Sequence, residues 1–184
     1  MLSKTFRKMA LVAVVAAVLI PALFVLAACG YSERFGEWYK GDTLIGRVTA
    51  IRRLPDILIF AEDGQSYKRI TPEPGNEIVA VYVEIINQDV SKIAISLEEG
   101  SAELDRLDGT AEWKQMNAFA RGVTVTEFKE GEQYYDQLMW GSKELIKGYQ
   151  IQGWSLFEVP KGTKFLRFVW READTIFMPF KKDD

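Results

Sequence analysis

Residues 74–87 read Pro-Gly-Asn-Glu-Ile-Val-Ala-Val-Tyr-Val-Glu-Ile-Ile-Asn, and this stretch decides the fold. Branched apolar side chains recur at every second position, at Val79, Val81, Val83 and Ile85. A period of two places these side chains on one face of an extended strand, and β-branched residues favour that conformation. The Pro-Gly pair before the run and the asparagine after it are turn-forming residues. The stretch therefore predicts a long, half-buried β-strand.

Similar short patterns continue on both sides of this strand. Further strands are expected at 45–51, 57–60, 65–70, 93–97, 101–107, 123–128, 156–159, 166–170 and 176–180. Asp63-Gly64, Asp108-Gly109 and Pro160-Lys161-Gly162 are turn signals between them. Helical periodicity is poor throughout, and residues 132–147 are expected to form only a short helix or a long loop. Many short strands without alternating helices predict an all-β, immunoglobulin-like β-sandwich.

The amino terminus has the pattern of a secretory signal peptide. Three basic residues and no acidic one lie in the first 28 positions, and residues 10–28 carry no charged or polar side chain. Leu26, Ala27, Ala28, Cys29 and Gly30 follow one another, and the Leu-Ala-Ala-Cys run resembles the bacterial lipobox. The small residues would fit a signal peptidase, and the thiol of Cys29 would accept a diacylglyceryl group. We expect Cys29 to become the lipidated first residue of the mature chain, anchored through its acyl chains.

An uncleaved transmembrane helix is the alternative, because nineteen apolar residues are long enough to cross a bilayer. Both interpretations place the remaining chain outside the cytoplasm, since flanking positive charge stays inside. We expect a lipoprotein signal peptide at 1–28, an anchor and short tether at 29–43 and the sandwich at 44–184. Residues 31–39 carry four aromatic side chains, which could either meet the membrane interface or dock against the domain.

Composition excludes several classes of function. The chain contains no histidine and one cysteine, so it has no Ser-His-Asp triad, no histidine-ligated zinc and no intrachain disulfide. Beyond residue 28 it carries 20 basic against 26 acidic residues, a net charge of about −6. That balance argues against nucleic-acid binding, which needs a clustered basic surface. No nucleophile-elbow, P-loop or dinucleotide-binding motif is found. We therefore expect no enzymatic activity and no cofactor.

A family resemblance supports the same fold. Residues 74–87 and residues 153–162, which read Gly-Trp-Ser-Leu-Phe-Glu-Val-Pro-Lys-Gly, resemble strand signatures of small immunoglobulin-like domains of bacterial lipoproteins. That family is known as domains of unknown function or as immunoprotective extracellular antigens. The resemblance covers about residues 45–180 and departs from the family pattern between 111 and 147. It implies a fold and an anchor, and it implies no reaction.

Two features are candidate binding sites. Acidic residues lie close together around Glu103, Asp105 and Asp108, and calcium favours such oxygen ligands, although the order of an EF-hand is missing. Aromatic side chains are frequent from residue 113 to 154, and we expect Trp140, Tyr134 and Tyr135 to offer partner contacts. The alternative to a calcium site is an ordinary charged strand with its turns. The alternative to a partner surface is that the aromatic side chains fill the core.

The favoured hypothesis is a non-catalytic, extracytoplasmic interaction module, lipid-anchored to a bacterial membrane, with a protein or cell-envelope partner. The alternative is a lipoprotein that captures a small molecule, a glycan or calcium. An apolar cleft with convergent polar groups would favour ligand capture, and a flat aromatic patch would favour protein contact.

Overall fold

A central antiparallel sheet carries the strand predicted at residues 74–87. In the computed structural model, which describes residues 35–126 and 132–180, that strand is β5 (Asn76–Asn87). The sheet contains, side by side, β1 (Tyr39–Lys40), β2 (Leu44–Leu54), β5 and β12 (Gln150–Pro160). The described residues belong to one compact unit, Arg34–Asp184.

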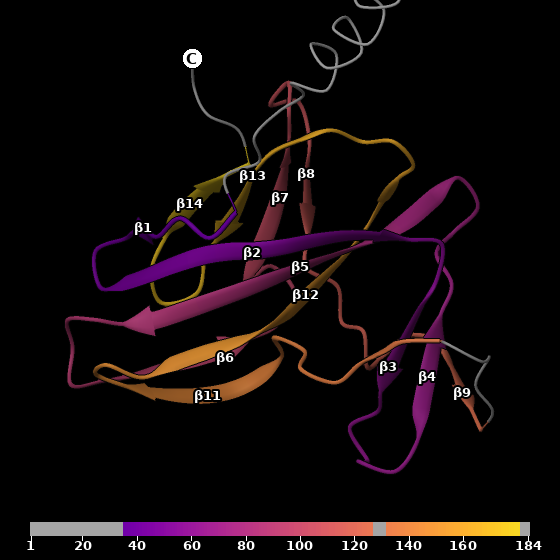
Figure 1. Ribbon diagram of the computed structural model, residues 1–184, viewed down its shortest axis with the longest axis horizontal. Helices are drawn as coiled ribbons and strands as arrows, with labels where there is room; N and C mark the ends of the chain where they lie inside the picture. The colour runs from indigo at the N-terminus through magenta and orange to yellow at the C-terminus, as the bar shows by residue number, and fades with distance from the viewer. Residues whose placement is uncertain (1–34, 127–131, 181–184) are drawn as a thin grey trace, which may run out of the picture. The chain divides into compact units, whose positions relative to one another are not determined.

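The two faces of β5 bury different cores. The predicted apolar face is confirmed, because Val79, Val81, Val83 and Ile85 are all completely buried in the main core. Two further sheets cover this face (Figure 1). One has the order β14 (Ile176–Pro179), β13 (Phe165–Trp170), β7 (Ala102–Arg106) and β8 (Glu112–Lys114), and the other pairs β11 (Gly141–Ile146) with β6 (Lys92–Leu97). Sheets packed face to face over an apolar core make this domain a β-sandwich.

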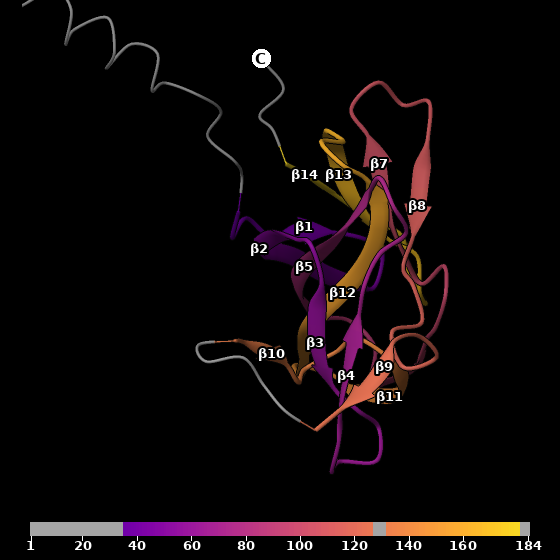
Figure 2. The same cartoon turned by 90° about the vertical axis from the view of Figure 1, so that its right-hand side faces the viewer.

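The opposite face of β5 is covered at one end only. A third small sheet has the order β10 (Tyr134–Tyr135), β3 (Ile57–Phe60), β4 (Tyr67–Ile70) and β9 (Val123–Val125). Ile57, Ile59 and Ile70 from this sheet pack with Ile78 and Ala80 of β5 in a second core. Figure 1 shows β3, β4 and β9 grouped beyond one end of the long strands, and Figure 2 shows the same arrangement after a 90° turn. The sandwich therefore carries an additional partial layer.

Most sequence-predicted strands are confirmed, with shifted ends. β3 and β4 form the hairpin expected around Asp63-Gly64, and β12 and β13 flank the expected turn at 160–162. The expectation of a short helix or long loop at 132–147 was wrong, because β10 and β11 lie there. β11 buries only Leu145 of its six residues, so it lacks the alternation that reveals a strand. The strand expected at 123–128 ends at Val125.

The segment before residue 44 is partly built into the domain. Tyr39 and Lys40 pair with Gly46 and Ile45 in the central sheet, within the range 29–43 assigned to the tether. Phe35 and Tyr39 pack against the main core, as the docking interpretation expects. Trp38 is 40% exposed, with the Arg47 guanidinium 4.4 Å from its ring centroid.

Candidate functional site

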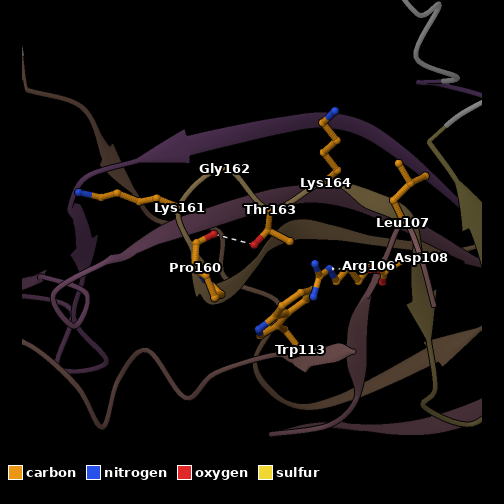
Figure 3. A pocket seen from close by; sticks show the side chains of 9 residues that line it. All are labelled: Arg106, Leu107, Asp108, Trp113, Pro160, Lys161, Gly162, Thr163 and Lys164. Atoms are coloured by element: carbon orange, nitrogen blue, oxygen red, sulfur yellow. Dashed lines mark hydrogen bonds and ion pairs between the residues drawn. The ribbon is translucent and has the colours of Figure 1, made fainter. Parts of the chain in front are cut away.

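A groove of about 510 Å³ lies where the β7–β8 hairpin meets the β12–β13 turn. It is lined by Arg106, Leu107, Asp108, Trp113, Pro160, Lys161, Gly162, Thr163 and Lys164. Its volume falls within the range of small-molecule sites. In Figure 3 the Arg106 side chain reaches between Thr163 and Trp113, while Lys161 and Lys164 point outward from opposite parts of the rim. The groove therefore combines a cationic rim with one large aromatic ring.

The β12–β13 turn is held in place from two sides. The Arg53 guanidinium donates hydrogen bonds to the carbonyl of Thr163 and to the carboxylate of Glu77. The same carboxylate accepts the Gly162 amide at 3.0 Å, and the Thr163 hydroxyl donates to the Pro160 carbonyl at 2.6 Å. Gly162 has a φ of 77°, a conformation that favours glycine. These contacts fix the backbone that carries both lysines.

The hairpin side of the groove is stabilised by Asp108. Its carboxylate accepts the Thr110 hydroxyl at 2.7 Å and the Thr110 amide at 3.1 Å, an arrangement typical of tight turns. These hydrogen bonds, together with the nearby Arg106 charge, hold the pKa of Asp108 below its usual value. Arg106 Nε lies 3.2 Å from the carboxylate. The Leu107 amide donates to the Lys164 carbonyl at 2.9 Å, which joins the two walls of the groove.

Trp113 closes the groove against the domain. Its ring meets Phe165 edge to face, with 6.0 Å between the centroids, and Arg53 lies 4.9 Å from the centroid of the Phe165 ring. Trp113 is half-buried, so part of the indole stays accessible. An indole beside cations offers an apolar surface next to anion-binding groups.

The groove is positively charged within a negatively charged chain. Arg106, Lys161 and Lys164 face one acid, Asp108, which leaves a net charge of +2 on the lining. Lys161 and Lys164 are exposed, and neither forms an ion pair with any residue in the described ranges. Cationic side chains without an ion-pair partner, carried by a backbone whose polar groups are already hydrogen-bonded, are suited to binding an anionic group.

The three predicted aromatic contact residues have different surroundings. Tyr134 is 51% exposed, and its ring lies 5.2 Å from that of Tyr67. Tyr135 is only 5% exposed and packs edge to face against Trp154 in the second core. Trp140, expected to be exposed, is half-buried. The three residues do not form one surface, and Tyr135 serves the core.

The acidic cluster differs in membership from the one expected. Carboxylate oxygens of Glu103, Asp105 and Glu112 lie within 4.8 Å of one another, and Asp108 belongs instead to the groove. Arginine neutralises two of the three, because Arg171 donates to Glu103 and Arg167 to Asp105, each at 2.6 Å. The cluster is thus balanced by side chains on the neighbouring strand, and acidic residues alone do not define a metal site.

The lipidation residues Leu26, Ala27, Ala28, Cys29 and Gly30 lie outside the described residues. Within the described ranges, no helix has the length and apolar character needed to cross a bilayer.

The groove is not predicted by any local pattern in the sequence. The turns at 108–109 and 160–162 are each predicted, but nothing local brings them together. The signal that the sequence does carry is the spacing of Lys161 and Lys164 around a glycine turn, and it is weak because neither lysine belongs to a basic run.

No family model matches the chain, and no curated protein matches it. Two solved structures are similar to it, each at 12% sequence identity over 80% of this chain. One is "a putative lipoprotein (ycdA)" from Bacillus subtilis subsp. subtilis str. 168, with a TM-score of 0.46, and this chain spans 40% of its length. The other is "an uncharacterized beta-sandwich protein" from Clostridium difficile 630, with a TM-score of 0.43 and 91% of its length covered. At this similarity, the assignment of the all-β sandwich rests on the strand pairing and the two cores described above.

Proposed function

We propose that this chain is a non-catalytic, lipid-anchored, extracytoplasmic module of a bacterial cell envelope that binds an anionic group in the groove between β7–β8 and β12–β13. The groove carries the binding part of the proposal, because three cationic residues and an accessible indole line it, with Arg106 inside and Lys161 and Lys164 on the rim. The Leu26-Ala27-Ala28-Cys29 run supports the anchor. The resemblance of residues 74–87 and 153–162 to immunoglobulin-like lipoprotein domains agrees with the anchor.

The groove favours ligand capture over a flat protein contact. Its walls are held by hydrogen bonds within each turn and between them, so the backbone that carries the cations is in place before a ligand arrives. A pre-formed site avoids the entropy cost of ordering a loop on binding. Sulfate, phosphate and carboxylate groups are the chemical classes that Arg106, Lys161 and Lys164 would recognise. Catalysis is not part of the proposal, because the lining offers no nucleophile paired with a base.

Metabolic labelling tests the anchor. Cells that express the protein are fed an alkyne fatty acid, and the labelled protein is followed by gel fluorescence. Label should appear on the wild-type chain and disappear in Cys29→Ala, which should also retain its full-length signal peptide. Label that persists in Cys29→Ala would refute lipidation at this residue.

Titration with inorganic pyrophosphate tests the groove. Wild-type protein should show a saturable change in tryptophan fluorescence, and Lys161→Ala combined with Lys164→Ala should weaken the affinity at least about tenfold, because two charge-assisted contacts are lost. Lys143→Ala with Lys147→Ala, two exposed lysines remote from the groove in sequence, is the matched control and should leave the affinity unchanged. Equal affinity in both double variants would refute the assignment of the site.

A further inference from the structure

A series of aromatic contacts links the groove to the first described residue, Phe35, whose neighbour Gly36 donates its amide to the Val48 carbonyl of β2. Phe35 meets Phe180 edge to face at 6.2 Å between centroids, and Phe180 meets Phe165 at 6.4 Å. Phe165 in turn meets Trp113, the ring in the groove, at 6.0 Å. A continuous series of aromatic contacts thus connects the first described residue with the groove. Figures 1 and 2 both show the β7–β8 hairpin beside the β13–β14 strands.

The covalent tether limits how far Phe35 can lie from the bilayer. Phe35 is six positions after Cys29, and a fully extended chain spans at most about 3.6 Å per residue, so the tether reaches about 20 Å. Acyl chains on Cys29 would therefore keep Phe35 within about 20 Å of the headgroups. Such a short tether would keep the whole domain, with its groove, close to the membrane surface.

The charge and shape of the groove complement an anionic bilayer. The groove carries a net charge of +2, whereas the chain beyond residue 28 carries about −6, so the remaining surface is repelled by acidic lipids. Leu107, 36% exposed, directly follows β7 and lies between Arg106 and Asp108 at the start of the β7–β8 turn. Cations beside an exposed apolar side chain suit contact with a membrane surface, where the cations meet phosphates and the apolar side chain enters the interface.

We infer that the groove docks onto anionic phospholipid headgroups of the same membrane that holds the acyl anchor, with Arg106, Lys161 and Lys164 contacting phosphates and Leu107 entering the interface. This inference rests on the proposed lipidation of Cys29. Docking orients the domain, so that the β5–β6 and β11–β12 turns face away from the bilayer. A surface potential from acidic lipids contributes about a fivefold factor in the docked population for each basic residue near the surface.

The experiment uses the lipidated protein reconstituted in vesicles. Because Cys29 is the only cysteine and is acylated, Leu107→Cys introduces a single free thiol, which is labelled with an environment-sensitive fluorophore. A second protein carries the label at Tyr149→Cys, a position 63% exposed in the β11–β12 turn. Each is placed in phosphatidylcholine vesicles, or in vesicles that also contain phosphatidylglycerol, and lipids with a quencher near the headgroup report proximity.

The label at residue 107 should be quenched in the phosphatidylglycerol vesicles and much less in pure phosphatidylcholine, while the label at residue 149 stays unquenched. Reversal of both rim lysines, Lys161→Glu with Lys164→Glu, should lower the docked population at least about twentyfold. The matched reversal Lys143→Glu with Lys147→Glu changes the net charge equally and should leave quenching at residue 107 in place.

Three outcomes would overturn the inference: equal quenching in both lipid mixtures, quenching that survives the rim-lysine reversal, or quenching that the matched reversal abolishes as well. Added soluble polyphosphate provides a fourth comparison. If it changes the fluorescence at residue 107 while acidic vesicles do not, the groove serves a soluble anionic polymer and membrane docking is refuted. Failure of the anchor itself is distinguishable, because unlipidated protein would not co-float with vesicles of pure phosphatidylcholine, to which the groove is not expected to dock.

Discussion

Asp174 joins two turns that are distant in sequence, and its removal should destabilise the whole sandwich. One carboxylate oxygen accepts the amides of Thr43 and Leu44, both at 2.8 Å, and the other accepts the Asp42 amide at 3.2 Å. A Cβ atom at Gly41 would lie 2.3 Å from this carboxylate, so the turn before β2 closes around it only because residue 41 is glycine. Leu44, the first residue of β2, is completely buried.

The size of the expected loss in the free energy of unfolding follows from these hydrogen bonds. A bond to a charged group contributes about 1.5–3 kcal/mol net, and a buried amide left without an acceptor costs about 1–3 kcal/mol. Asp174→Ala leaves the Thr43 and Leu44 amides without their acceptor, and we expect it to lower the free energy of unfolding by about 3–4 kcal/mol. Asp174→Asn keeps one acceptor oxygen without the charge, and we expect it to lower the free energy of unfolding by about 1–2 kcal/mol.

The effect should also depend on pH. Burial raises the pKa of Asp174, but the hydrogen bonds from the Leu44, Thr43 and Asp42 amides outweigh it and hold the pKa below its usual value. A carboxyl with a lowered pKa in the folded state contributes stability that is fully present above its unfolded pKa of about 4. That contribution is lost as the pH falls through the lower, folded-state pKa. The difference between wild type and Asp174→Ala should therefore shrink as the pH falls below about 4.

Urea unfolding followed by tryptophan fluorescence measures both effects, since buried Trp170 lies four residues away and its indole donates to the Glu172 carbonyl at 2.7 Å. Asp136→Asn, an exposed position, controls for the loss of one charge. A loss below about 0.5 kcal/mol in Asp174→Ala would contradict the assigned hydrogen bonds, because surface substitutions stay within that range. A difference independent of pH between about 7 and 3 would contradict the ionised state of the carboxyl.

Three further predictions concern packing and ions. Gly153→Ala should lower the free energy of unfolding, measured in urea, by about 1–3 kcal/mol. The reason is that its Cβ would lie 2.4 Å from the Gln137 carbonyl oxygen and push the 137–139 segment away from β12. A variant as stable as the wild type would contradict this close approach. Trp140→Ala should cost less than the roughly 3–5 kcal/mol expected for the fully buried Trp170→Ala, since Trp140 is half-buried; equal losses would make Trp140 a core residue. Excess calcium against chelator should leave the melting temperature unchanged, because Arg171 and Arg167 already neutralise Glu103 and Asp105; a calcium-dependent rise would restore the metal hypothesis.

The main core could be predicted where one face of a strand is buried and the other is not. In β5 the alternation of Val79, Val81, Val83 and Ile85 identified both the strand and its buried face. In β11 the same reasoning failed, because a strand paired on one side and largely exposed has little apolar pattern to detect. Very short strands carry even less of an alternating pattern. Tyr134 and Tyr135 are adjacent in β10, and their opposite orientations make the first exposed and the second buried.

The groove was beyond the reach of local patterns for a different reason. Its two walls are about fifty residues apart in sequence, and the hydrogen bond from the Leu107 amide to the Lys164 carbonyl joins them only after β13 has paired with β7. Each wall looked like an ordinary turn, with one or two basic residues of the kind that usually stay solvated. Only the pairing register shows that three cations share one cavity.

The absence of histidine, which first served to exclude catalytic mechanisms, also indicates what should control the groove. Histidine is the side chain whose ordinary pKa lies near neutrality, and none occurs among the 184 residues. The acid in the groove, Asp108, has a pKa held below its usual value by Thr110. Ionic strength is therefore the variable to which anion binding should respond near neutral pH, because added salt shortens the screening length from about 10 Å at 0.1 M to about 3 Å at 1 M. Affinity for sulfate, an anion whose own charge is constant in this range, should fall steeply with salt and change little between about pH 6 and pH 8. A titration in that pH range that altered binding as strongly as salt would show that a group outside the described groove takes part.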